Sequence, residues 1–125
     1  MDTARTFTLL ASLLGFLGVA LGAFGAHALR ESLSPRDLDI FETAVRYQLV
    51  HAVALVGVAW ATTRWPDSSA VLAGWFFVAG VAVFSGSLYL LVLSGQRWLG
   101  AVTPLGGIAL LAGWVALGWA ALRGS

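Results

Sequence analysis

Four long apolar runs occupy nearly the whole chain and constrain its fold more than any other feature. They cover about residues 7–29, 47–63, 70–93 and 99–122. About 20 helical residues cross the hydrocarbon core of a bilayer, so apolar runs of this length are typical of membrane spans. We therefore expect an all-α, polytopic membrane protein in which residues 1–125 form a single transmembrane helical domain.

The composition excludes several classes of protein. Charged residues make up 10% of the chain, against about 25% in ordinary soluble domains. The absence of cysteine excludes disulfides and thiolate metal sites. A net charge of +1 gives no electrostatic support for a nucleic-acid partner. The expected partners are the lipid bilayer and either further copies of the chain or another membrane complex.

The first apolar run resembles a secretory signal peptide, because it ends at Ala26-His27-Ala28. The run is about twenty residues long, which exceeds a typical signal-peptide core. We therefore expect it to be retained as the first span.

Turn residues mark where two of the helices begin or end. Ser34 is a good N-cap, and Pro35 suits the first helical position. Gly95 can close the third helix because glycine readily adopts the left-handed conformation.

The stretch of about residues 35–46 is predicted to form an amphipathic helix between the first and second spans. Its apolar and polar side chains recur at helical spacing on opposite faces. Glu42 precedes Arg46 by four residues, the favourable order for a helical ion pair. We expect this segment to lie at the membrane interface and then turn into the second span.

Small residues form stripes on the first and last spans. Four glycines of the first span share one helical face, and two of the last span share another. They are Gly15, Gly18, Gly22 and Gly25, and Gly106 and Gly113. Such stripes let neighbouring backbones approach closely, and packing within one chain is favoured over self-association. The sequence leaves open whether Trp60, Trp75, Trp114 and Trp119 face lipid or protein.

Polar side chains within the apolar runs form a candidate polar site. The candidates are His27, Tyr47, Gln48, His51, Ser85, Ser87, Tyr89 and Thr103. His27 ends one span and His51 begins the next, so we expect both histidines at similar depth. Polar groups inside a membrane are costly and often functional, and histidine titrates near neutral pH. The alternative, which is favoured, is that these side chains bond across helices and lock the bundle.

Two histidines on adjacent helices could also ligate a haem or a metal ion. However, the chain has no HxxxH pattern and no repeated Glu-x-x-His motif. We expect no metal and no cofactor. No nucleophile elbow, phosphate loop or paired catalytic carboxylates appear, so we assign no catalytic residue and do not expect an enzyme.

Several short segments resemble a bacterial four-helix membrane family of unknown function, the domain of unknown function 423 family. This family is related to transmembrane protein 256. The segments are residues 21–27, 47–52, 84–89, 103–107 and 112–114. The resemblance covers nearly the entire chain and implies a multi-pass protein of the bacterial inner membrane. It implies no activity.

Three functions remain open. The first is a structural or accessory membrane protein that binds lipid or a partner. The second is a small transporter or channel that moves protons or a solute as an oligomer. The third is a cofactor-binding protein or an enzyme that uses the two histidines.

Overall fold

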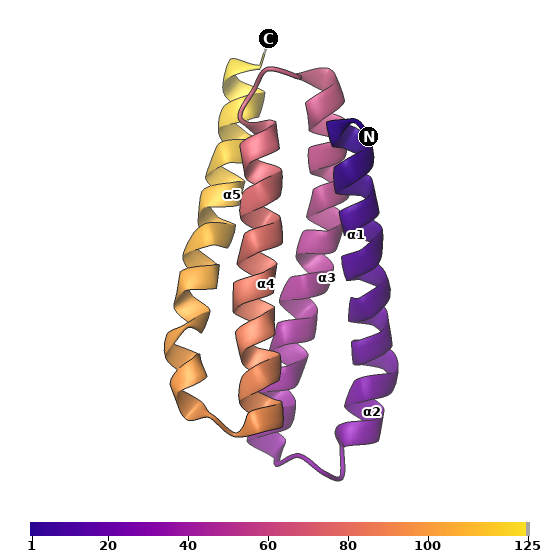
Figure 1. Cartoon of the computed structure of the whole chain (residues 1–125), viewed down its shortest axis with the longest axis vertical. Helices are drawn as coiled ribbons and strands as arrows, with labels where there is room; N and C mark the ends of the chain where they lie inside the picture. The colour runs from indigo at the N-terminus through magenta and orange to yellow at the C-terminus, as the bar shows by residue number, and fades with distance from the viewer. Residues whose placement is uncertain (125) are drawn as a thin grey trace.

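The part of the chain that the structure describes forms a row of four long helical stretches (Figure 1). The computed structural model describes residues 1–124. The first stretch comprises α1 (Thr3–Val19), a π-helical segment η1 (Ala20–Gly25) and α2 (Ala26–Leu29), and the second is α3 (Pro35–Arg64). The third is α4 (Ala70–Ser94), and the fourth comprises a 3-10 segment η2 (Arg97–Ala101) and α5 (Thr103–Arg123). Helix α1 packs on α3, α3 on α4, and α4 on α5. The prediction of an all-α chain with four helices long and apolar enough to span a membrane is confirmed.

Side-chain caps and a left-handed glycine set several helix ends. Asp2 accepts a hydrogen bond from the backbone nitrogen of Arg5 at 2.8 Å, and Ser34 accepts one from Asp37 at 3.1 Å. Each bond satisfies a backbone donor that the first helical turn leaves free. At the end of α4, Gly95 adopts φ 75°, as the sequence predicted.

The separate amphipathic helix predicted for residues 35–46 is wrong. The segment is the first part of α3, a single 30-residue helix. Its apolar face does not lie on a membrane surface, because Phe41 and Val45 are buried against Leu91, Val92 and Leu99. Local amphipathicity thus reflects burial against α4 and η2 rather than an interfacial position.

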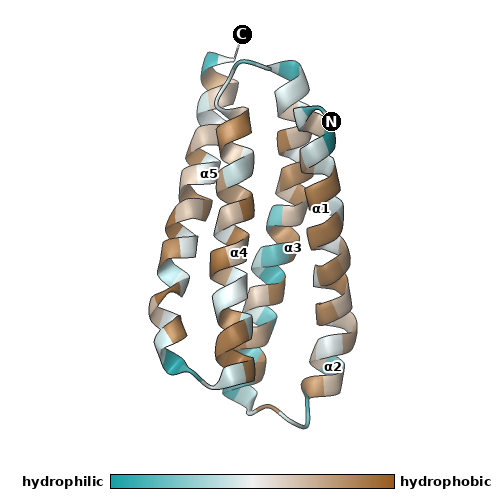
Figure 2. Ribbon diagram, in the orientation of Figure 1, coloured by the Kyte–Doolittle hydropathy of each residue, from teal (hydrophilic) through white to brown (hydrophobic). Residues whose placement is uncertain are grey.

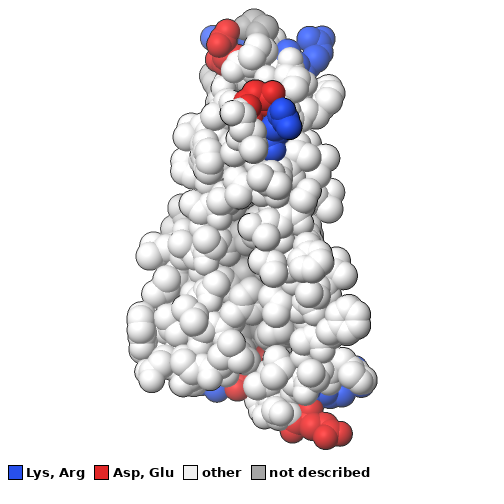
Figure 3. All heavy atoms as spheres, turned by 45° about the vertical axis from the view of Figure 1, so that its right-hand side comes forward, with Lys and Arg blue, Asp and Glu red and all other residues white. Residues whose placement is uncertain are grey.

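The outer surface is apolar along most of its length and charged at both ends. Hydrophobic residues predominate in α1, α4 and α5, whereas the N-terminal half of α3 carries several hydrophilic ones (Figure 2). In the face shown in Figure 3, the acidic and basic side chains gather near the two ends, with uncharged residues between them. The large apolar side chains exposed between these ends include Phe16, Val53, Leu93 and Val115. This distribution matches a chain whose middle lies in hydrocarbon.

Candidate functional site

Gln48 links three helices near the middle of α3. Its side chain is buried, with 4% exposed. The Nε2 atom donates to the carbonyl oxygen of Leu14 in α1 at 2.8 Å. The Oε1 atom accepts from the hydroxyl of Tyr89 in α4 at 2.6 Å. One amide therefore connects α1, α3 and α4.

Three hydroxyls add links from α4 to α3 and from α4 to α5. The Ser85 hydroxyl, which is buried, donates to the carbonyl oxygen of Ala44 in α3 at 2.7 Å. The hydroxyl oxygens of Ser87 and Thr103 lie 2.6 Å apart and join α4 to α5. Hydroxyls in membrane helices commonly bond across helices in this way.

His51 joins α3 to α5 through Trp114. Its Nε2 atom accepts from the indole Nε1 of Trp114 at 3.1 Å. Its Nδ1 atom lies 2.7 Å from the carbonyl oxygen of Tyr47. A carbonyl oxygen only accepts, so Nδ1 carries the proton and both ring nitrogens are occupied. The arrangement fits a neutral imidazole whose hydrogen bonds are complete.

Trp114 also belongs to this network, although it was not among the residues of the predicted polar site. The sequence left open which way its indole faces. An indole N–H inside a membrane span needs an acceptor, and His51 offers the acceptor one helix away. The signal available from the sequence was an indole donor in one span and an imidazole acceptor in another. The spacing of residues 51 and 114 does not predict that these two pair.

The side chains of Tyr47 and His27 lie outside the hydrogen-bond network. The Tyr47 side chain is 40% exposed, and its ring packs on Phe84 with centroids 4.4 Å apart. His27 is exposed on α2. Gly25 lies beside Phe41, and His51 is ten residues farther along α3, about 15 Å at 1.5 Å per residue. The two histidines therefore lie at different heights, in contrast to the expectation from sequence.

This placement bears on metal and cofactor binding. His51 has no free ring nitrogen, and His27 is not beside it. Within residues 1–124, no group of three or more His, Asp or Glu side chains could hold a metal ion. The donor set does not fit a group ligated by both histidines.

The predicted ion pair between Glu42 and Arg46 is not formed in the described part of the chain. The side chains of Glu42 and Arg46 are both exposed. Among the described residues, the salt bridge joins Arg97 to Asp37 instead. The two guanidinium nitrogens donate to the two carboxylate oxygens at 3.0 and 3.3 Å. This bidentate pair ties the turn before α5 to the first turn of α3.

The six striped glycines face neighbouring helices of the same chain. A Cβ atom on Gly18 would approach Leu49, and one on Gly22 would approach Val45. On α5, a Cβ atom on Gly106 would meet the backbone of Phe84. Gly15 and Gly25 face Ala52 and Phe41, and Gly113 faces Phe77. The π-helical segment η1 contains Gly22 and Gly25 and was not anticipated.

Two grooves open between helices that are not neighbours in the row. The first, which we call the α3–α5 groove, has a volume of about 380 Å³. It is lined by Tyr47, His51, Phe84, Pro104, Gly107, Ile108, Leu110, Leu111 and Trp114. The second lies between α1 and α4, has a volume of about 340 Å³, and has Gln48, Ser85 and Tyr89 among its lining residues. Both grooves are mainly apolar.

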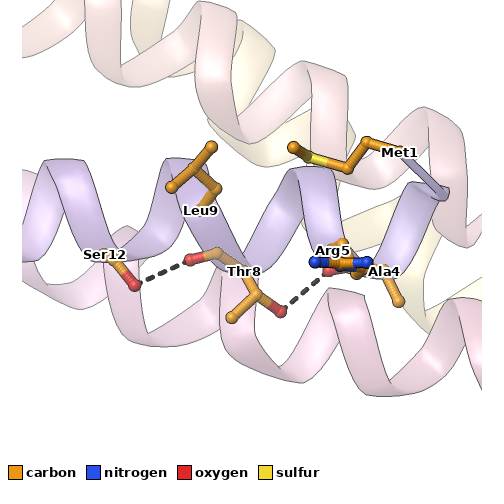
Figure 4. A pocket seen from close by; sticks show the side chains of 6 residues that line it. All are labelled: Met1, Ala4, Arg5, Thr8, Leu9 and Ser12. Atoms are coloured by element: carbon orange, nitrogen blue, oxygen red, sulfur yellow. Dashed lines mark hydrogen bonds between the residues drawn. The ribbon is translucent and has the colours of Figure 1, made fainter.

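A third hollow lies on the outer face of α1 and is shown in Figure 4. The hydroxyls of Thr8 and Ser12 donate to the carbonyl oxygens of Ala4 and Thr8, at 2.8 and 2.9 Å. Both hydroxyls are therefore satisfied within their own helix. The residues that line this hollow all come from the first twelve residues of the chain. The hollow is therefore a surface depression rather than an interhelical site.

Comparison with known proteins places the chain in a family. The family described as "Protein of unknown function (DUF423)" matches residues 21–107. The chain belongs to the DUF423 family. This range includes Gln48, His51 and Tyr89 but ends before Trp114.

Relatives in the DUF423 family extend over most of the chain. It is 43% identical over 115 residues to UPF0382 membrane protein SH2409 of Staphylococcus haemolyticus, covering 90% of this chain and 92% of that one. It is 40% identical over 125 residues to UPF0382 inner membrane protein YgdD of Escherichia coli K12, covering 97% and 92%. Bacillus subtilis YwdK is 38% identical over 120 residues, covering 95% and 98%. No solved structure matches the chain significantly.

The family and the four long apolar helices together identify a multi-pass protein of the cell membrane. The family resemblance stated from the sequence motifs is thereby confirmed. The family description itself records no activity.

Proposed function

We propose that this protein is a structural or accessory membrane protein that acts through its lipid-facing surface, by binding lipid or another membrane protein. The observation that carries the proposal is the completeness of the internal hydrogen bonding. Within residues 1–124, no buried side-chain nitrogen or oxygen lacks a partner. Polar groups that are fully paired within a bundle stabilise it, and these buried groups are not free to bind a solute.

The partners of these polar groups support the same role. Gln48 bonds to α1 and α4, Ser85 bonds to α3, and Ser87 bonds to α5. A proton or solute that used these groups would first have to break bonds between helices. Transport by a polar pathway therefore has less support than the role of a stable scaffold.

The lipid-facing surface supplies the features that a binding role requires. The α3–α5 groove and the groove between α1 and α4 are mainly apolar, and both lie between membrane-spanning helices. Exposed long apolar side chains are among their lining residues, such as Ile108 in the α3–α5 groove and Leu17 in the groove between α1 and α4. Apolar concavities of a few hundred Å³ are typical of ligand sites.

Two measurements test the proposal. The full chain is reconstituted in vesicles of phosphatidylethanolamine and phosphatidylglycerol that contain a pH-sensitive dye. Under an imposed membrane potential, we expect proton entry equal to that of protein-free vesicles, for both the wild type and His51→Phe. Proton flux that occurs in the wild type and is lost in His51→Phe would overturn the proposal.

The second measurement concerns lipid binding directly. A ligand that binds only the folded state raises the unfolding midpoint as its concentration rises. We expect the thermal midpoint of the purified chain in detergent to rise on addition of phosphatidylglycerol. A midpoint that is independent of every added lipid contradicts lipid binding.

A further inference from the structure

We propose that the α3–α5 groove holds one hydrocarbon chain of a membrane glycerolipid, with the ester end of that chain at the Tyr47 hydroxyl. The proposal rests on the proposed function and names its ligand and its site. It is argued from the shape of the groove, its lining and the position of its single uncommitted polar group.

The dimensions of the groove favour a slender occupant. Its lining residues on α5 extend from Pro104 to Trp114, about 15 Å at the helical rise. A volume of about 380 Å³ over that length corresponds to a mean cross-section of roughly 25 Å². A helix about 10 Å across has a cross-section of roughly 80 Å². An extended hydrocarbon chain, with carbon contacts near 4 Å, needs only about 15–20 Å². One hydrocarbon chain therefore fits along the groove, whereas a whole helix does not enter it and would only lie over its open side.

The lining gives the chain a continuous apolar surface. Phe84 of α4 contributes its ring, and Gly107 of α5 leaves open space beside that ring. Trp114 is held at the His51 end by its hydrogen bond, which fixes the indole. Large rigid side chains that are fixed before binding lose little freedom when a ligand arrives. The groove is therefore formed without its ligand.

Tyr47 places a polar group at one end of this apolar groove. Side chains on a helix point toward its N-terminus, so the Tyr47 phenol is directed toward the Pro35 end of α3. The hydroxyl has no hydrogen bond to the protein among the described residues, and the side chain is 40% exposed. Tyrosine is typical of the level where hydrocarbon meets the polar headgroups. An ester carbonyl oxygen of a glycerolipid lies at that level and accepts such a hydrogen bond.

Gly107 and Gly118 offer a matched pair of variants on α5. A Cβ atom at Gly107 would contact the Phe84 ring at an ordinary 3.9 Å, so a leucine there extends into the groove without a clash at its Cβ. A Cβ atom at Gly118 meets nothing within 4 Å, and Gly118 does not line the groove. The substitutions Gly107→Leu and Gly118→Leu therefore make the same chemical change inside and outside the proposed site.

The experiment measures lipid retention by native mass spectrometry in detergent with added 1-palmitoyl-2-oleoyl phosphatidylglycerol. We expect the wild type and Gly118→Leu to retain one lipid equally. We expect retention to fall about fivefold or more in Gly107→Leu, because its side chain replaces the contacts of the hydrocarbon chain. We expect a smaller loss of about threefold in Tyr47→Phe, as for one hydrogen bond. Equal retention by Gly107→Leu and Gly118→Leu would overturn the site, even if lipid still raises the unfolding midpoint.

A second measurement does not depend on how the variants fold. The wild type in vesicles is irradiated with a phosphatidylcholine that carries a photoreactive diazirine in one chain. We expect crosslinks concentrated on residues 104–114 of α5, and near Tyr47 when the diazirine lies close to the ester. Crosslinks spread evenly over the exposed faces of α1 and α5 would overturn the proposal. Crosslinks between two copies at residues 104–114 would also overturn it, because a second chain would then cover the groove.

Discussion

The Nε2 atom of His51 accepts a hydrogen bond from the indole nitrogen of Trp114, 3.1 Å away, and these residues are 63 positions apart in the chain. The bond joins α3 to α5, which otherwise make few contacts because α4 lies between them. The His51 and Trp114 side chains also line the α3–α5 groove. A single interaction therefore connects the stability of the row with the shape of its candidate binding surface.

We expect His51→Phe and Trp114→Phe each to lower the free energy of unfolding. Each leaves the other polar group without its partner inside the span. Hydrogen bonds between membrane helices contribute about 0.6 kcal/mol on average and up to about 1.7 kcal/mol. A double-mutant cycle measured by unfolding in mixed micelles should give a coupling energy in this range. A coupling energy of zero would show that the two rings act independently.

Gln48→Leu should destabilise the chain more than the loss of one hydrogen bond does. The substitution leaves both the Tyr89 hydroxyl and the Leu14 carbonyl oxygen without their amide partner. A buried polar group left without a partner costs about 1–3 kcal/mol, and we expect a loss in that range from unfolding curves. Gln96→Leu is the matched control, because Gln96 is exposed in a turn. If both substitutions have equal effects, the amide of Gln48 does not link the helices.

Gly106→Ala should be strongly destabilising, whereas Gly118→Ala should not. A Cβ atom at Gly106 would overlap the backbone of Phe84, which cannot move aside without separating α4 from α5. Overpacking of this kind typically costs about 1–3 kcal/mol. At Gly118 nothing lies within 4 Å, and alanine favours a helix by up to about 1 kcal/mol over glycine. The thermal midpoints of the two variants in one detergent decide the matter.

The Arg97–Asp37 pair should make a small contribution that depends on salt. The Arg97 side chain is 56% exposed, and exposed ion pairs contribute about 0.2–1 kcal/mol. We expect Arg97→Gln to lower the free energy of unfolding by no more than this at low ionic strength, and by less in about 1 M salt because charges are screened. Glu42→Gln should have no comparable effect, because Glu42 does not form the predicted pair. An effect of Arg97→Gln that is unchanged by salt would indicate that the arginine acts by packing.

The sequence predicted those features that depend on local properties of the chain. Run length and hydropathy predicted the four long helices, since hydrocarbon thickness fixes the length of a span. Ser34 and Gly95 predicted helix ends, because capping and left-handed geometry are determined by one or two residues.

Features that depend on neighbouring helices were not predictable in this way. Periodicity gives the face on which Phe41 and Val45 lie, but it does not tell whether lipid or protein covers that face. The spacing of Glu42 and Arg46 permits a local pair, yet Asp37 pairs with an arginine sixty residues away. The similar depth expected for His27 and His51 ignored the connection after α2 and the first turns of α3, which lie between the two histidines. The Tyr89–Gln48 bond likewise depends on how α4 lies against α3.

The row arrangement has a consequence for how the chain assembles. All of the extensive interfaces join helical stretches that follow one another in the sequence: the first with α3, α3 with α4, and α4 with α5. Each helix can therefore pack against the one inserted just before it, without waiting for a distant segment. Contacts between sequence neighbours close short loops at low entropic cost and favour rapid folding. The protein is thus built so that membrane insertion and tertiary assembly can proceed together, one helix at a time.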